Sequence, residues 1–241
     1  MSTIKLPICK IILDQPLKRS NIRSFRGAVS EAVGLGNILF HNHTDDTQKP
    51  LRFRYPLVQY KVQQGKAAII GLAEGAIELR KHISLDGEFF AGTFPILSRS
   101  DENFKLAMTA EPKPYYLAQW LALNQTNAER WGQFSSTAAQ QAELQRILVA
   151  HLLAFAAGMG FDVPRPKGLE VGILEFAGPR RASYHGARFS SFDVRFTANI
   201  NLPFDIGIGK SASHGFGCIW KPRSYIRKLK SKPAAQFSFE W

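Results

Sequence analysis

Residues 189–202 give the strongest strand signal in the chain. Apolar side chains occupy every second position, and they are Phe192, Val194, Phe196, Ala198, Ile200 and Leu202. The positions between them hold Asp193, Arg195, Thr197, Asn199 and Asn201. Because successive side chains of a strand point to opposite faces of its sheet, this pattern predicts a strand with one buried and one polar face. The fold must therefore place an apolar layer against the buried face.

A helix predicted over residues 139–159 supplies that layer. Its apolar stripe recurs at helical spacing and comprises Leu144, Ile147, Leu148, His151, Leu152, Phe155 and Met159. Since His151 lies on this stripe, it is predicted to be a core histidine with satisfied polar atoms rather than a catalytic one. Further strands are predicted over residues 169–177 and 217–220. The second half of the chain therefore reads as a helix packed on an antiparallel sheet.

The first half contains a similar mixture of elements. Strands are predicted over residues 4–13, 51–62 and 66–72, and helices over residues 20–33 and 73–83. The alternation of the second strand slips at Pro56, which indicates an edge position or a bulge. The order strand, helix, strand, strand, helix is most of a ferredoxin-like unit.

Together these patterns predict an α+β protein made of two tandem ferredoxin-like (RRM-like) units with antiparallel sheets. The turn-rich stretch around residues 86–103 suggests a boundary near residue 105, so that the units span residues 1–105 and 106–220. A further helix is predicted over residues 115–131. Residues 221–241 are predicted to form a basic C-terminal tail.

The net charge indicates the kind of partner. Lysine and arginine number 31 and aspartate and glutamate 19, which gives +12 at neutral pH. A field of this sign attracts polyanions, of which nucleic acid is the most common in the cytoplasm. An acidic protein or an anionic membrane surface would be attracted by the same field.

Cysteine content and hydropathy narrow the class of protein. Cys9 and Cys218 are too few for a disulfide framework or a four-ligand zinc site, and both are predicted to lie in strands as small core residues. No apolar run is long enough to cross a bilayer, and the N-terminus lacks the apolar core of a signal peptide. A cytoplasmic location without membrane contact is expected.

A glycine-rich loop follows the long strand and occupies residues 207–217. It does not match the phosphate-binding loop of nucleoside triphosphatases, because Phe204 stands where that motif needs glycine. It does not match the dinucleotide fingerprint either, because Ala212 replaces the third glycine. A plain RRM strand is disfavoured since Cys218 occupies the position of a stacking phenylalanine.

The remaining interpretation is a loop that holds a polyanion. Glycines permit positive φ and a close approach of a phosphate backbone, while unpaired amides and a lysine attract the charge. The predicted RNA-binding residues are Gly207, Gly209, Lys210, His214, Gly215 and Gly217, with Arg223, Arg227 and Lys228 from the basic tail. The competing interpretations are a mobile hairpin loop without a binding role and a solvated terminus.

Two histidines, His41 and His43, are the candidates for chemistry. In an extended segment, residues i and i+2 point the same way, so both imidazoles would lie on one side. Imidazole groups move protons at neutral pH, and RNA carries its own nucleophile in the 2′-hydroxyl, so that no metal is required. The alternatives are a metal site completed by Asp45 or Asp46, and a pair of loop histidines without a task.

The loop entering a C-terminal strand resembles that of the CRISPR-associated repeat-processing endoribonucleases, part of a wider superfamily of repeat-associated RNA-binding proteins. Residues 39–43 and 53–61 are similar to the N-terminal signature of one subgroup. The resemblance implies two ferredoxin-like folds and a role in CRISPR RNA processing and antiviral defence. It also favours the catalytic interpretation of the histidine pair, because related enzymes carry catalytic histidine in this region.

The implied activity is a hydrolase-class, metal-independent endoribonuclease. It would cleave CRISPR repeat transcripts into guide RNAs and leave a 2′,3′-cyclic phosphate and a 5′-hydroxyl, without a cofactor. His41 and His43 would share the base and acid roles, and Lys49, Tyr55 or Lys61 would stabilise the phosphate. The expected partners are repeat RNA and CRISPR effector subunits, with monomer and homodimer both open. The alternatives are a non-catalytic RNA-binding subunit of an effector complex and a basic protein-interaction module.

Overall fold

The computed structural model describes residues 3–34, 36–41, 55–84, 88–89, 94–164, 168–184 and 187–221. The N-terminal half contains β1 (Thr3–Pro16), η1 (Arg19–Asn21), α1 (Ile22–Val33), α2 (Ile38–His41), β2 (Val58–Gln63), β3 (Lys66–Leu72), α3 (Glu74–Lys81), β4 (Glu88–Phe89) and β5 (Phe94–Trp120). The C-terminal half contains α4 (Gln125–Gly132), α5 (Thr137–Gly158), β6 (Val171–Tyr184), β7 (Ala187–Ile200), η2 (Ala212–His214) and β8 (Cys218–Trp220).

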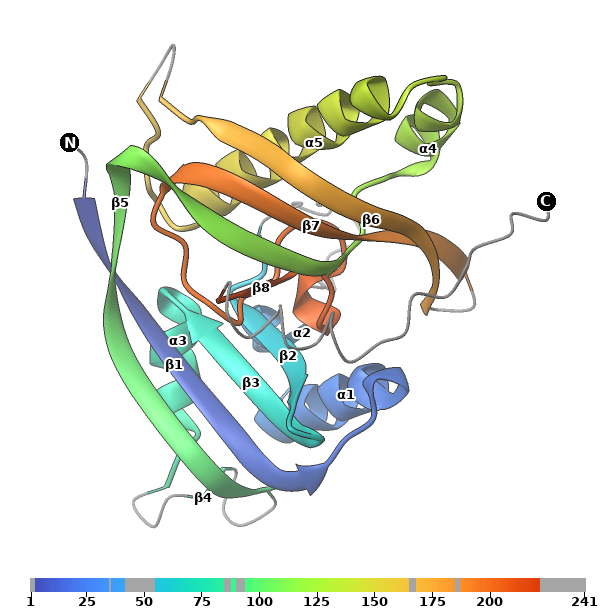
Figure 1. The fold of residues 1–241 in the computed structure, drawn as a ribbon. Helices are drawn as coiled ribbons and strands as arrows, with labels where there is room; N and C mark the ends of the chain where they lie inside the picture. Colours follow the sequence, from blue (N-terminus) through green and yellow to red (C-terminus); the bar gives the residue numbers. More distant parts are fainter. Residues whose placement is uncertain are drawn as a thin grey trace.

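The N-terminal half has the ferredoxin-like topology. Its four main strands lie in the order β2, β3, β1, β5, and every neighbouring pair is antiparallel. Along the chain, α1 joins β1 to β2, and α3 joins β3 towards β5, which completes the strand–helix–strand–strand–helix–strand unit. In Figure 1 this sheet fills the lower half of the molecule, with α1 and α3 against it.

The C-terminal half repeats the same strand order, but a loop stands in place of the second helix. Its strands lie in the order β8, β5, β7, β6, again antiparallel, and α5 packs on the sheet beside β6 (Figure 1). Between β7 and β8, where a second ferredoxin helix would stand, the chain forms the glycine-rich loop with the short turn η2. The predicted α+β class with antiparallel sheets is confirmed.

The long strand β5 belongs to both halves. Its residues Ile96 to Ala107 pair with β1, and its residues Met108 to Trp120 pair with β7. The change of partner lies close to the boundary that the sequence suggests near residue 105. Because this point lies within one continuous strand, the two units are joined by β5 itself and not by a separate linker.

The sequence-based assignments fail around β5. The predicted helix over residues 115–131 is wrong in its first part, since Tyr115 to Trp120 pair with β7 and β8, and α4 begins only at Gln125. The helix α4 is capped by Asn124, whose side chain accepts from the Asn127 amide. The stretch read as turn-rich also contains β5 from Phe94 onward. Pairing on both edges outweighs the local helix propensity.

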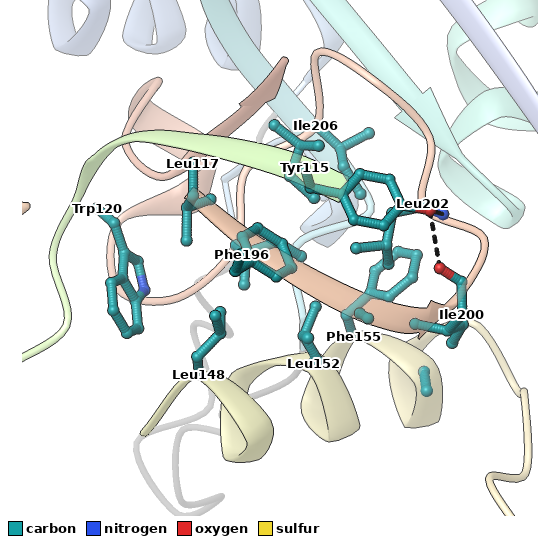
Figure 2. Close-up of a cluster of buried hydrophobic side chains, with 14 of the residues drawn as sticks. Tyr115, Leu117, Trp120, Leu148, Leu152, Phe155, Phe196, Ile200, Leu202 and Ile206 are labelled. Atoms are coloured by element: carbon teal, nitrogen blue, oxygen red, sulfur yellow. Dashed lines mark hydrogen bonds between the residues drawn. The ribbon is translucent and has the colours of Figure 1, made fainter. Parts of the chain in front are cut away.

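The strongest sequence signals are confirmed. The apolar positions of β7 from Phe192 to Ile200 are buried, and α5 covers them with the stripe that helical spacing predicted (Figure 2). Tyr115 ties β5 to the end of β7, because its hydroxyl donates to the Ile200 carbonyl at 2.9 Å and accepts from the Leu202 amide at 3.2 Å. Of the cysteines, Cys9 is buried in β1 and Cys218 is partly exposed in β8; both are free thiols.

The N-terminal sheet is buried on both faces. One face, with Cys9, Ile11 and Ile69, packs on the helices of its own half. The opposite face, with Leu6, Ile8, Ile70 and Leu72, joins the core of the C-terminal half. The two halves therefore share one apolar core, and polar residues on that second face of β2 lie under the glycine-rich loop.

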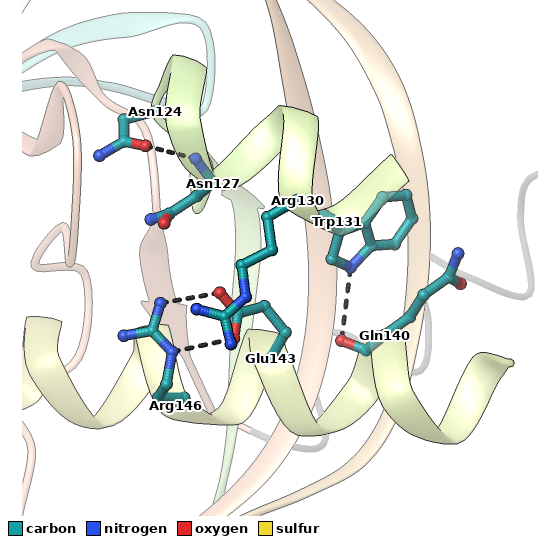
Figure 3. A network of polar contacts seen from close by, with 7 residues as sticks. All are labelled: Asn124, Asn127, Arg130, Trp131, Gln140, Glu143 and Arg146. Carbon is teal, nitrogen blue, oxygen red and sulfur yellow. Dashed lines mark hydrogen bonds and ion pairs between the residues drawn. The ribbon is translucent and has the colours of Figure 1, made fainter. Parts of the chain in front are cut away.

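A polar network fixes α4 on α5 (Figure 3). Glu143 is buried, and its carboxylate accepts from Arg146 at 2.7 and 2.9 Å and pairs with Arg130 at 3.8 Å. The Trp131 indole donates to the Gln140 carbonyl at 3.3 Å. Paired guanidinium groups compensate for the desolvation of the carboxylate and lower the pKa of Glu143.

Among the helices in the described part of the chain, none is both long and apolar enough to span a bilayer.

Candidate nucleic-acid interface and active site

The backbone of the glycine-rich loop is firmly braced. The Ile208 amide donates to the Gly217 carbonyl at 2.7 Å, and the Gly217 amide donates to the Gln119 carbonyl of β5 at 3.1 Å. Lys210 forms a bridge with Leu121, so the tip of the loop is also tied to the end of β5. The sequence predicted unpaired backbone amides in the loop, but the amides of Ile208 and Gly217 are hydrogen-bonded.

Two of the loop glycines are required by close packing. A Cβ atom at Gly217 would lie 2.0 Å from the Ile208 carbonyl oxygen, and Gly217 has a φ of +59°. A Cβ atom at Gly207 would lie 2.7 Å from the Lys61 Nζ and 2.7 Å from the Phe216 carbonyl oxygen. These glycines let the loop fold onto itself and onto β2, which gives them a structural role independent of any ligand.

The underside of the loop rests on residues around β2. The Gly207 amide donates to Gln59 Oε1 at 2.7 Å, Gln59 Nε2 donates to the Tyr55 hydroxyl at 2.9 Å, and that hydroxyl donates to the Gly207 carbonyl at 2.7 Å. The three bonds form a closed ring that satisfies both backbone groups of Gly207. Tyr55 and Gln59 thereby position the start of the loop.

Lys61 lies next to this ring and is almost fully buried. Only 3% of the residue is exposed, and its Nζ donates to the Ala212 carbonyl at 3.1 Å. Burial disfavours the charged form and lowers the pKa of Lys61 to about 8. As placed, Tyr55 and Lys61 bind loop carbonyls from below.

The middle of the loop rests on a tryptophan and a histidine. Gly209 has a φ of +87°, and a Cβ atom there would lie 2.6 Å from the Trp120 indole nitrogen and 2.8 Å from His151 Nδ1. The indole donates to His151 Nδ1 at 3.1 Å. His151 is therefore a histidine with a satisfied acceptor, as its place on the apolar stripe predicted. Its burial lowers its pKa to about 4.

We expect the His151–Trp120 pair to make stability depend on pH. Below about pH 6.5 His151 becomes protonated in the unfolded chain, whereas in the folded protein it stays neutral until the pH approaches 4. The contribution of neutral His151 to folding stability is therefore complete above pH 6.5 and is lost as the pH falls towards 4. The shift corresponds to about 3 kcal/mol. Thermal melts from pH 7 to 4 should show a falling melting temperature, and His151→Gln, which keeps an acceptor but does not titrate, should flatten the slope. An unchanged slope in this variant would contradict the assignment.

Cationic side chains lie along the outer side of the loop. The Arg19 guanidinium lies over the Phe216 ring at 4.6 Å and donates to the Gly215 carbonyl and to the Gln119 side chain. Lys210 is exposed and lies 4.6 Å over the Phe189 ring of β7. Stacked cations next to backbone glycines suit a phosphate chain with unpaired bases.

The end of α2 approaches the same loop. Arg26 of α1 places its Nη1 2.7 Å from His214 Nε2 and donates from Nε to the Phe40 carbonyl at 3.3 Å. Ser30 and Tyr60 donate to the same carbonyl at 3.2 and 3.0 Å. Phe40 directly precedes His41. The backbone before the first candidate histidine is therefore linked to the loop through one side chain, that of Arg26.

Family models identify the chain. The model of the Cas6b N-terminal domain matches residues 3–91, and the model of the Cas6b C-terminal domain matches residues 107–222. The chain belongs to the Cas6b family. The point where β5 changes from β1 to β7 lies at the start of the second Cas6b region.

Solved Cas6b structures share this fold. A crystal structure of Cas6b superposes with a TM-score of 0.73 at 21% identity and covers 90% of this chain and 100% of its own. A crystal structure of a CRISPR RNA processing endoribonuclease Cas6b gives a TM-score of 0.65 at 19% identity, with coverages of 90% and 98%. An uncharacterised protein of Methanocaldococcus jannaschii is 29% identical over 139 residues, which are 58% of this chain and 91% of that protein.

Only some of the predicted site residues lie in the part of the chain that the structure describes. Gly207, Gly209, Lys210, His214, Gly215 and Gly217 lie together in the loop with Tyr55 and Lys61 beneath it. His43, Lys49, Arg223, Arg227 and Lys228 lie outside the described residues, as does the side chain of His41. Within the described ranges, no group of three or more histidine, cysteine or acidic residues could hold a metal ion. Asp45 and Asp46 lie outside those ranges.

Sequence reasoning missed the residues that connect the two halves of the Cas6b site. The sequence patterns do not mark Arg19, Arg26 or Gln59 as site residues. Each bonds to a residue of the loop more than a hundred positions away, and local spacing carries no signal of such a contact.

Proposed function

We propose that this Cas6b-family protein is an endoribonuclease that cleaves CRISPR repeat transcripts without a metal ion. The family models over both halves support the substrate and the reaction class. The observation that supports named residues is the anchoring of the Phe40 carbonyl, because the backbone just before His41 is bonded to Arg26 and Arg26 also contacts His214 of the loop.

The reaction uses the RNA as its own nucleophile. One histidine of the pair His41 and His43 removes the proton of the 2′-hydroxyl, whose oxygen forms a bond to the adjacent phosphorus. The bond from phosphorus to the 5′-oxygen breaks, and the other histidine protonates that leaving oxygen. The products are a 2′,3′-cyclic phosphate and a 5′-hydroxyl. Imidazole suits both tasks because its ordinary pKa is near 6.5.

The glycine-rich loop holds the RNA in this scheme. Lys210 offers an exposed ammonium group, and Arg19 offers a stacked guanidinium on the same loop. Arg223, Arg227 and Lys228 extend the positive charge along the tail, and Lys49 supplies charge near the histidines. Tyr55 and Lys61 contribute to phosphate stabilisation by fixing the loop from beneath. Residues 1–105 carry the chemistry and residues 106–220 carry the loop.

A cleavage assay tests the function directly. The protein is incubated with end-labelled repeat RNA in excess chelator, beside a substrate with a 2′-deoxy residue at the cleavage site. We expect cleavage of the first substrate to persist, no cleavage of the second, and products that carry a cyclic phosphate. Loss of cleavage in chelator, or cleavage of the deoxy substrate, would exclude this mechanism. Salt-dependent binding without any cleavage would identify a non-catalytic RNA-binding subunit instead.

A further inference from the structure

The Arg26 guanidinium contacts both the glycine-rich loop and the segment that carries His41. Arg26 donates from Nε to the Phe40 carbonyl and from Nη1 to His214 Nε2, at 3.3 and 2.7 Å. These two acceptors belong to different elements, one to α2 and one to the end of η2. The planar fork of arginine reaches both at once, which the single ammonium of lysine does not.

The proton pattern of His214 follows from this contact. Arginine donates and does not accept, so His214 Nε2 must accept, and the ring proton must reside on Nδ1. Nδ1 lies 2.9 Å from the Ser213 hydroxyl, which can accept it. The bond to Arg26 therefore requires a neutral His214 ring held by its neighbour in the loop. Any ligand that changes the position or charge of this ring also changes its bond to Arg26.

The segment at the other end of Arg26 depends on such contacts. The helix α2 is only four residues long, and helices of this length have no stability of their own. Its position is fixed by the Phe40 side chain, which is 1% exposed, and by the three donors to the Phe40 carbonyl. The hydroxyl groups of Ser30 and Tyr60 bond to the Phe40 carbonyl within the N-terminal half, whereas the Arg26 guanidinium also bonds to His214 of the loop.

We propose that Arg26 is a positioning residue that couples occupancy of the glycine-rich loop by RNA to the placement of the α2 backbone before His41. The inference rests on the proposed function for its catalytic consequence. RNA bound at the loop fixes His214, His214 fixes Arg26, and Arg26 fixes the Phe40 carbonyl. When the link between the loop and α2 is lost, RNA that binds at the loop no longer orders α2.

Arg26→Met tests the coupling with Arg23→Met as its matched control. Arg23 lies on the same helix, carries the same charge and is exposed. Two quantities are measured: the single-turnover cleavage rate at saturating protein, and the gain in amide-exchange protection of residues 37–41 when uncleavable 2′-deoxy RNA binds. We expect Arg26→Met to slow cleavage by roughly 10- to 100-fold, since small misplacements of catalytic groups have effects of this size. We expect the gain in protection to be lost.

The remaining variants separate positioning from charge and from folding. Arg23→Met should keep the rate and the protection, and both methionine variants should weaken RNA binding to a similar small extent. Arg26→Lys should restore the binding and not the rate. His214→Gln should add little to Arg26→Met in the double variant, because the two residues act as one unit. A melting temperature near that of the wild type shows that Arg26→Met folds.

Several results would overturn the proposal. Equal rates for Arg26→Met and Arg23→Met, rescue of the rate by lysine, or an unchanged gain in protection of residues 37–41 would each do so. If the wild-type protein binds RNA and does not cleave it, the proposed nuclease function fails. In that case the exchange measurement by itself decides whether Arg26 couples the loop to α2.

Discussion

Replacing His41 with alanine is expected to lower the cleavage rate by roughly 10²- to 10⁴-fold, which is the usual contribution of a general acid or base. His43→Ala should have an effect in the same range. The affinity for 2′-deoxy repeat RNA should stay close to that of the wild type, because the proposed binding residues lie in the loop and the tail. Single-turnover rates and a binding titration on the same RNA measure both quantities.

The pH dependence of the rate distinguishes the two roles. The wild-type rate should pass through a maximum, with one limb for the base and one for the acid, and each single variant should lose one limb. Asn42→Ala lies between the two histidines and serves as the control for a substitution in this segment. If Asn42→Ala were as slow as His41→Ala, the effect would belong to the segment and not to the imidazole groups.

Gly217→Ala is expected to have the largest effect on stability. The added methyl group meets the Ile208 carbonyl oxygen at 2.0 Å, and the residue must keep a φ of +59°. The carbonyl has little freedom to move, because Ile208 and Gly217 are also joined by a backbone hydrogen bond of 2.7 Å. We expect a loss of about 3 kcal/mol and a fall in melting temperature on the order of 10 °C.

Gly27→Ala is the matched control for this prediction. Gly27 lies in α1, and a Cβ atom there would meet nothing within 4 Å. In this open helical position alanine should stabilise the protein by about 0.5–1 kcal/mol. Thermal melts of both variants compare the two sites. If Gly217→Ala melted together with the wild type, the close packing of the loop would not be the reason for its glycine.

The sequence predicted those elements whose signals are local. β7 and α5 were identified almost to their ends, because alternation and helical spacing are written into consecutive residues. Most elements of the first ferredoxin-like unit, from β1 to α3, were also predicted from the sequence. β5 was not, because its extended conformation depends on partners that lie far away in the sequence. Its C-terminal part read as a helix for this reason.

The candidate site shows the same division. The glycine-rich loop and the histidine pair stand out in the sequence as unusual residues in polar surroundings. The burial of Lys61 under the loop could not be deduced from its position in a strand, since loop residues that are distant in the sequence, among them Gly207 and Ala212, cover it. The same holds for Tyr55, whose hydroxyl bonds to Gly207 across the shared core.

The sequence by itself therefore determined the α+β class and the strongest helix and strand. It also carried the resemblance that led to the family and marked the loop as the candidate RNA-binding element. The tertiary structure decided that β5 serves both halves and that the loop replaces a helix of the second unit. It also decided that Arg26 joins His214 to the Phe40 carbonyl. The physical reason is that periodicity and turn chemistry act between neighbours in the chain, whereas strand partners and bridging side chains are selected only when the shared core closes.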